Sequence, residues 1–188
     1  MKTFLQFHEE AEFLRESSGS NIEKTLNKAV NVLALFHIPH YVCGGFAVQE
    51  HGYPRFTVDV DIIVPDVQLA REKLCMNGFK ENPGSKMPVT DRETKVEVDL
   101  LPGGSKVDPG PLTLPLPTQV SNKPQILTLQ NLISSKLSTY IGRGIRRAQD
   151  YADVVKLIEA NHLLRDYGID PKIRDEYHKI WDGLHEEE

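Results

Sequence analysis

The chain has 188 residues, of which 22 are Lys or Arg and 27 are Asp or Glu, so its formal net charge is −5 at neutral pH. This length suits one domain, or one core with an appendage. With 26% charged and 39% hydrophobic residues, the composition is that of a soluble globular protein, which excludes a disordered or membrane-spanning chain. The net negative charge also argues against binding of nucleic acid by the electrostatic field of the whole protein. Binding by a local basic face remains possible.

Cysteine usage and the N-terminus indicate a reducing compartment. Cys43 and Cys75 have neither metal-ligand spacing nor a disulfide framework around them, which favours two packed thiols. Residues 1–16 contain acids and lack the apolar segment of a signal peptide. No apolar run approaches the roughly 20 residues that span a bilayer. We therefore expect a cytoplasmic protein without membrane contact.

Hydrophobic periodicity predicts alternating helices and strands in the first part of the chain. Ser20 and Glu23 form a capping-box pattern at the start of the first helix. The strand over 56–64 is the most regular stretch, because its period of two places Thr57, Asp59 and Asp61 on one face and Val58, Val60, Ile62 and Val64 on the other. In chain order we predict a helix over 21–37, strand 41–43, short helix 46–51, strand 56–64, helix 66–77 and strand 95–100.

The second part of the chain changes character. Residues 102–124 are rich in Gly, Pro, Ser and Leu, which predicts a long connection with one short edge strand near residues 112–120. Three helical patterns follow, over about 128–141, 145–161 and 171–184. We therefore expect an α/β (α+β) fold: a small mixed β-sheet with helices packed on it over 1–122, and a helical C-terminal region over 123–188.

Asp59 and Asp61 are the first candidate functional residues. Carboxylates at i and i+2 of a strand project side by side, and their repulsion raises one pKa unless a cation sits between them. Mg²⁺ commonly uses one or two carboxylates together with substrate phosphates. The alternative is an edge strand that exposes alternating acids to water, but the β-branched run around them is typical of a central strand.

Asp99 supplies a third carboxylate, at the end of the strand 95–100 and on the same face as Glu97. If this strand lies beside 56–64, three acids converge, which suits the two metal ions of phosphoryl transfer. Gly44 and Gly45 follow a strand and open a helix, a geometry that can hold a phosphate. A Gly pair also marks ordinary tight turns, so this interpretation stays open beside the phosphate one.

Taken together, these motifs resemble the nucleotidyltransferase superfamily related to DNA polymerase β. More narrowly, they are similar to the small AbiEii-type toxin and minimal nucleotidyltransferase group. Those proteins share a Gly-Gly or Gly-Ser turn that opens a helix, an R-x-T-x-D-x-D strand and a third acid on a neighbouring strand. The resemblance extends over roughly residues 25–160. It is carried by Gly44-Gly45-Phe46-Ala47, Arg55-x-Thr57-x-Asp59-x-Asp61, Asp99, Leu132-Ile133-x-x-Lys136-Leu137 and Arg147-x-x-Asp150-x-x-Asp153.

The resemblance implies an enzyme that uses Mg²⁺, with Mn²⁺ as an alternative, to move NMP from an NTP to a hydroxyl group and release pyrophosphate. It implies that Asp59, Asp61 and Asp99 bind metal and carry catalysis. It also implies nucleotide binding by five residues: Gly44, Gly45, Arg55, Thr57 and Lys136. For Arg55, pairing with a carboxylate is an equal alternative to phosphate binding.

This sequence departs from the family pattern at two points. Gly45 stands where the classical motif has Ser. Gln149 stands at a position where the family has Lys, so a basic side chain is either missing there or replaced by Arg146 or Arg147. The sequence leaves the roles of Arg146, Arg147, Asp150 and Asp153 undecided.

The acceptor is open as well, with RNA and a small molecule as candidates, and an antitoxin is a candidate partner. Two alternative functions are a nucleotide-binding or interaction protein of this fold without turnover, and a D-x-D nucleotide-sugar transferase. The complete set of three acids weighs against the first alternative. The short core weighs against the second, whose usual doubly wound sheet needs more chain.

Overall fold

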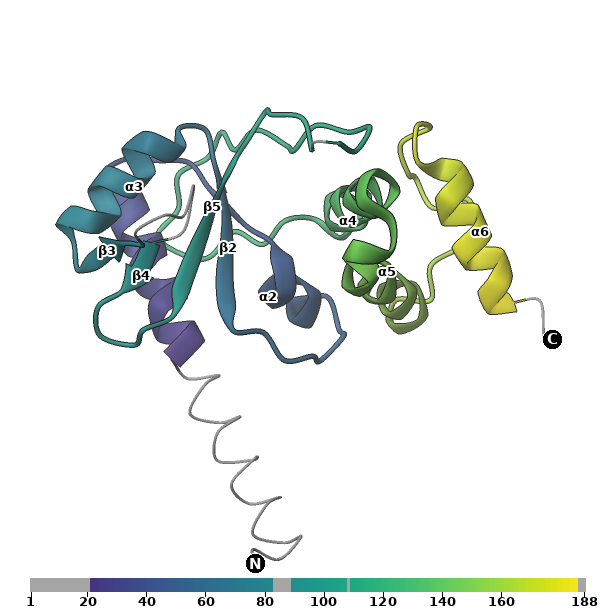
Figure 1. Ribbon diagram of the computed structural model, residues 1–188, viewed down its shortest axis with the longest axis horizontal. Coiled ribbons are helices and arrows are strands. Elements are labelled where there is room, and N and C mark those ends of the chain that lie inside the picture. Colours follow the sequence, from purple (N-terminus) through teal and green to yellow (C-terminus); the bar gives the residue numbers. More distant parts are fainter. Residues whose placement is uncertain (1–20, 83–88, 108, 186–188) are drawn as a thin grey trace, which may run out of the picture.

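The computed structural model describes residues 21–82, 89–107 and 109–185. Within these ranges five strands form one mixed sheet in the order β1-β2-β5-β4-β3, and helices cover both of its faces (Figure 1). β2 and β5 are parallel, and the other neighbouring pairs are antiparallel. Residues 21–35 form the first helix. The remaining elements are β1 (Tyr41–Val42), α2 (Gly44–Glu50), β2 (Asp59–Val64), α3 (Val67–Met76), β3 (Phe79–Glu81), β4 (Val89–Asp91), β5 (Glu97–Pro102), α4 (Leu129–Arg143), the 3₁₀ helix η1 (Gly144–Arg147), α5 (Ala148–Ala160) and α6 (Arg174–His185).

The fold is therefore the α/β class with a small mixed sheet that the patterning predicts. The predicted capping residue Ser20 and the interpretation of residues 1–16 fall outside the described ranges. Strand β2 begins three residues later than expected, because its first paired residue is Asp59, opposite Glu97 at the start of β5. Val58 lies before this pairing and is 65% exposed, so the prediction that it shares a face with Val60, Ile62 and Val64 is wrong.

One face of the sheet packs on the helix of residues 21–35 and on α3, which lie together beside β3 and β4 in Figure 1. The even-numbered side of β2, namely Val60, Ile62 and Val64, is fully buried there, as period-two alternation requires. Helix α3 begins at an N-cap, Asp66, whose carboxylate accepts a hydrogen bond from the Leu69 N–H. These contacts fix the face of β2 that points away from the acids.

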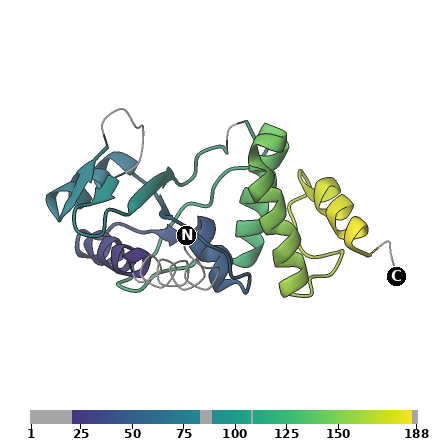
Figure 2. The ribbon, with the colours of Figure 1, turned by 60° about the horizontal axis from the view of Figure 1, so that its bottom comes forward.

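The opposite face of the sheet supports a second hydrophobic core, made by α2, α4, α5 and α6. Ile63 of β2 reaches this core and is fully buried. Helices α4 and α5 run side by side, and α6 packs outside them (Figure 2). Asp59 and Asp61 lie on the same side of β2 as Ile63, so the acids face the layer that carries α2 and α4.

Three local features differ from the sequence prediction. The strands β3 and β4 were not predicted, because each is only three residues long and too short for a clear period. The edge strand predicted near residues 112–120 is wrong over most of that range: among described residues, pairing is confined to 112–114, which form a bridge between Lys106 and Thr113 and backbone hydrogen bonds with residues 104–107. Prolines at 111, 115 and 117 lack the N–H groups that a paired strand needs.

Residues 125–127 join the two parts of the chain. The Val42 N–H donates to the Gln125 carbonyl at 2.7 Å, and the Leu127 N–H donates to the Val42 carbonyl at 2.8 Å. The segment therefore extends the sheet beside β1 before α4 begins. The division at residue 122 stays a prediction. None of the helices in the described ranges is long and apolar enough to cross a membrane.

Candidate active site

The three predicted acids meet at the centre of the sheet. In the parallel pair β2–β5, Asp61 lies opposite Asp99, and Asp59 lies opposite Glu97. One carboxylate oxygen from each of Asp59, Asp61 and Asp99 lies within 4.8 Å of the others, and all three side chains are half-buried. The parallel register thus places Asp99 beside two acids from a distant part of the chain, on strands that the sequence could only suggest were neighbours. We call these three residues the acid triad.

Crowding of negative charge in the acid triad changes its proton affinity. Burial, together with the charges of Asp59 and Asp99, raises the pKa of Asp61 to about 7, although Lys136 and Arg55 act in the opposite direction. Burial, followed by the charges of Asp59 and Glu97, also raises the pKa of Asp99. A divalent cation among these oxygens would relieve the repulsion, and hard oxygen donors are the ligands that Mg²⁺ and Mn²⁺ prefer. The residues present therefore fit such an ion.

The turn of Gly44 and Gly45 lies directly against the acid triad. Gly44 has a φ of +61°, and a Cβ at this position would overlap the Asp61 carboxylate. A Cβ on Gly45 would overlap the Thr57 side chain. The Cys43 N–H donates to the Asp61 carbonyl at 2.9 Å and anchors the turn to β2. Glycine is favoured at both positions because the turn approaches Asp61 of β2 and the Thr57 side chain so closely.

Thr57 supports the first acid of the triad. It lies just before β2 and is 6% exposed. Its Oγ1 donates to Asp59 Oδ1 at 3.0 Å, which fixes the orientation of that carboxylate. The structure thus joins Thr57 to an acid, whereas its role in nucleotide binding stays a prediction.

A second group of charges centres on Asp153 of α5, whose side chain is fully buried. Lys136 Nζ of α4 lies 2.6 Å from Asp153 Oδ2. Arg55 Nε lies 2.8 Å from Oδ1, and Arg55 Nη2 donates to Oδ2 at 3.1 Å. Gln149 Nε2 also donates to Oδ1, at 2.9 Å. Asp153 therefore holds two predicted nucleotide-binding cations at once, and for Arg55 the alternative of carboxylate pairing is realised.

Asp150, one helical turn before Asp153, extends this network. Its Oδ1 accepts from Lys136 Nζ at 3.1 Å, and its Oδ2 lies 3.2 Å from Arg147 Nε. Sequence reasoning left these two acids without a role. The available signal was their i, i+3 spacing, which places both on one face of α5, but no pattern could show that this face meets Lys136 and Arg55.

The acid triad lines one cavity of about 670 Å³ together with Lys136 and Arg55, and we call these two cations the cationic wall. The Gly44–Gly45 turn forms part of its rim, and Lys106, Arg143 and Arg146 add further positive charge. Its apolar lining comes from Ile63, Leu101, Pro102, Val107, Leu114 and Leu132. The cavity therefore combines carboxylates for a cation, cations for an anion, and an apolar surface.

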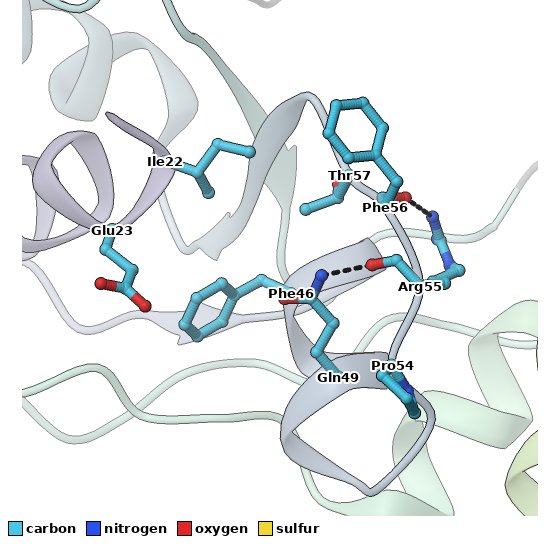
Figure 3. A pocket seen from close by; sticks show the side chains of 8 residues that line it. All are labelled: Ile22, Glu23, Phe46, Gln49, Pro54, Arg55, Phe56 and Thr57. Carbon is cyan, nitrogen blue, oxygen red and sulfur yellow. Dashed lines mark hydrogen bonds between the residues drawn. The ribbon is translucent and has the colours of Figure 1, made fainter. Parts of the chain in front are cut away.

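A second hollow of about 520 Å³ lies beside the segment that carries Arg55 and Thr57. Figure 3 shows Phe46, Gln49 and Pro54 on one side of it, with the Phe56 ring above. The Gln49 amide donates to the Arg55 carbonyl, and Arg55 Nη1 donates to the Phe56 carbonyl at 2.9 Å. The bond from Gln49 ties the segment to α2, so the backbone of Arg55 is fixed from this side while its guanidinium reaches Asp153.

Comparison with known proteins identifies the fold. No protein-family model matches the chain, and no curated protein matches it in sequence. A nucleotidyltransferase-like protein from Paracoccidioides brasiliensis superposes with a TM-score of 0.55 at 16% identity, over 90% of this chain and 89% of that one. The antibiotic-resistance factor ANT(2'')-Ia in solution superposes with a TM-score of 0.50 at 10% identity, over 90% and 95%. The chain thus has the nucleotidyltransferase fold, as its motifs predict.

Proposed function

We propose that this protein is a Mg²⁺-dependent nucleotidyltransferase, which moves a nucleoside monophosphate from an NTP to a hydroxyl group of an acceptor and releases pyrophosphate. The observation that carries the proposal is the acid triad, with three carboxylate oxygens within 4.8 Å of one another. A cationic wall across the same cavity is the complement that a triphosphate needs. The shared fold supports the same class of reaction.

The acid triad would hold the metal, with Mg²⁺ as the expected ion and Mn²⁺ as the alternative. A divalent cation bound there supplies positive charge that stabilises the phosphoryl oxygens during transfer. Asp59 offers its carboxylate in an orientation set by Thr57 Oγ1. Asp61 and Asp99 face each other across the parallel strands, so both carboxylates enter the cavity from a rigid part of the sheet.

The nucleotide would lie between the acid triad and the cationic wall. The Gly44–Gly45 turn comes closest to Asp61 and presents backbone there, so it is placed to contact the triphosphate. Lys136 and Arg55 would neutralise the charge that develops on the phosphates. Ion pairs with Asp153 fix the positions of both side chains.

We assign acceptance of the proton of the acceptor hydroxyl to Asp99, which β5 contributes to the triad and whose carboxylate lies beside those of Asp59 and Asp61. The hydroxyl oxygen then forms a bond to the α-phosphorus, the bond between that phosphorus and the pyrophosphate oxygen breaks, and pyrophosphate leaves.

The acceptor is an RNA or a small molecule that carries a hydroxyl group. Arg143, Arg146 and Lys106 at the cavity would favour an anionic acceptor, since they add positive charge beyond the pair held by Asp153. Membership of the AbiEii-type group, an antitoxin partner and a cytoplasmic location remain predictions from the sequence.

The direct test incubates the protein with Mg²⁺ and each α-³²P-labelled NTP, with total RNA or with a panel of small hydroxyl compounds. We expect label transfer to one acceptor class and stoichiometric pyrophosphate release. Mg²⁺-dependent NTP binding without transfer would instead identify a nucleotide-binding protein of this fold. Absence of both binding and transfer would refute the proposal.

A matched pair of variants assigns the activity to the acid triad. Asp61→Asn removes one metal ligand, whereas Glu97→Gln removes the same charge two residues before Asp99 on β5 and outside the triad. We expect transfer to be lost in the first variant and retained in the second.

A further inference from the structure

Two sets of opposite charges share the cavity without pairing with each other. The acid triad lies on β2 and β5, while Lys136 of α4 and Arg55, which precedes β2, line the same cavity. In the described ranges, the ion pairs of these two cations go to Asp150 and Asp153 and none goes to the triad. This separation is unexpected, because a cluster of half-buried carboxylates attracts any nearby cation.

Lys136 and Arg55 line the same cavity as Asp61, so their charges act on its carboxylate. Burial, Asp59 and Asp99 raise the pKa of Asp61, and the charges of Lys136 and Arg55 oppose that rise. Both cations are therefore near enough to interact electrostatically with the carboxylates of the acid triad. A lysine has a flexible stem and a compact charge, so Lys136 would be an effective competitor for the metal position if it were free to turn.

We infer that Asp153 is a positioning residue which retains Lys136 and Arg55 on the cationic wall and so keeps the acid triad available to a divalent cation. The inference rests on the metal site of the proposed function. Three contacts carry it: Lys136 Nζ at 2.6 Å, Arg55 Nε at 2.8 Å and Arg55 Nη2 at 3.1 Å, all to the carboxylate of one residue.

The surroundings of Asp153 fit this role. Its side chain is fully buried, so water does not screen its charge. Gln149 Nε2 donates to Oδ1 at 2.9 Å and fixes the carboxylate from the same helix. With both oxygens bonded and both cations held, the network has little freedom to rearrange.

Asp150 provides the matched control, because it also contacts Lys136 but does not contact Arg55. Its side chain is 15% exposed, and its second oxygen lies 3.2 Å from Arg147. Removal of the Asp150 charge leaves the pair of Lys136 with Asp153 intact, so Lys136 stays on the cationic wall.

The test measures binding of Mn²⁺ to the free protein, without nucleotide, by electron paramagnetic resonance of the unbound ion. We expect Asp153→Asn to weaken Mn²⁺ binding by about tenfold, as is typical when a residue that supports a metal site is removed. We expect Asp150→Asn to change it by less than about twofold. Circular dichroism and a thermal melt establish that each variant is folded.

Asp153→Asn leaves Lys136 and Arg55 without their shared carboxylate. Removing these two cations as well distinguishes a positioning role of Asp153 from a general structural role. If Asp153→Asn weakens binding because Lys136 and Arg55 turn to the triad, adding Lys136→Met and Arg55→Gln to it restores Mn²⁺ affinity. A purely structural role of Asp153 predicts only the gain in affinity that Lys136→Met/Arg55→Gln gives in protein that keeps Asp153. Where Asp153→Asn alone does not fold, the double variant Asp153→Asn/Lys136→Met is compared with the triple variant, since both lack the unpaired buried lysine.

The outcomes separate this inference from the proposed function. Wild-type protein that binds no Mn²⁺ overturns the metal site, and the inference with it. Wild-type binding with equal affinity in folded Asp153→Asn overturns the inference alone. Equal Mn²⁺ affinity of Asp153→Asn/Lys136→Met and of the triple variant that adds Arg55→Gln also overturns the inference alone.

Discussion

Asp61 and Asp99 lie directly opposite each other on the parallel neighbours β2 and β5, and with Asp59 they bring three carboxylate oxygens within 4.8 Å of one another. This arrangement is costly in the absence of a cation, because each negative charge opposes ionisation of the others. The cost is greatest for Asp61, whose pKa reaches about 7. The folded protein therefore holds a site that a divalent cation would stabilise.

The first prediction concerns removal of one ligand. Asp61→Asn should reduce Mn²⁺ affinity and transfer activity by more than about 100-fold, since it removes a direct ligand rather than a supporting residue. The measurements are Mn²⁺ titration by electron paramagnetic resonance and label transfer from α-³²P-labelled NTP. Glu97→Gln is the charge-matched control, and equal losses in the two variants would show that the effect is only one of net charge.

The second prediction concerns pH. The pKa of Asp61 is raised from 3.8 to about 7 in the folded protein, so between about pH 4 and pH 7 the native state binds more protons than the unfolded state. The free energy of unfolding of the metal-free protein should then fall as pH rises through this window, by no more than about 4 kcal/mol from Asp61. Urea unfolding in the presence of a chelator measures it.

Asp61→Asn supplies the reference for this pH experiment. Its unfolding free energy should lack the Asp61 contribution and exceed that of the wild type above pH 7. His40 acts in the opposite direction, because burial lowers its pKa below 6.5, but it is present in both proteins and cancels in the difference. A wild-type minus variant difference that does not change between pH 4 and pH 7 would contradict the prediction.

The third prediction tests the close approach of the glycine turn. Gly44→Ala combines a φ of +61° with overlap between the new Cβ and the Asp61 carboxylate. Gly144→Ala has a similar φ of +57° but open space around its Cβ. Both should lose about 1 kcal/mol or more from backbone strain, and only Gly44→Ala should also weaken Mn²⁺ binding. Equal effects of the two variants on Mn²⁺ binding would contradict this account.

The fourth prediction concerns the bond from Thr57 Oγ1 to Asp59 Oδ1 at 3.0 Å. Thr57→Val keeps the shape of this buried side chain and removes the donor, so it should weaken Mn²⁺ binding by about tenfold and cost about 1–3 kcal/mol of unfolding free energy. Thr57→Ser retains the hydroxyl and should stay close to wild type in Mn²⁺ affinity. The same Mn²⁺ titration, together with urea unfolding, distinguishes the two, and similar losses in both variants would argue against the hydrogen bond.

The sequence by itself determined the longer elements and the faces of the strand that carries Asp59 and Asp61. Alternation along residues 59–64 placed Asp59 and Asp61 on one side and buried Val60, Ile62 and Val64 on the other, because the side-chain period of a strand is fixed by its backbone. Helical spacing likewise predicted α4, α5 and α6, and the glycine pair marked the start of α2. These features could be predicted because they depend only on residues that are close together in the sequence.

Only the tertiary structure decided which of these elements meet. The register that sets Asp99 opposite Asp61 depends on pairing between strands that are distant in the chain and is absent from either strand alone. The same holds for Asp153, which a sequence pattern could place on a helix face but not between Lys136 and Arg55. Such contacts arise from the packing of α4 and α5 against the sheet, and packing is a property of the whole fold.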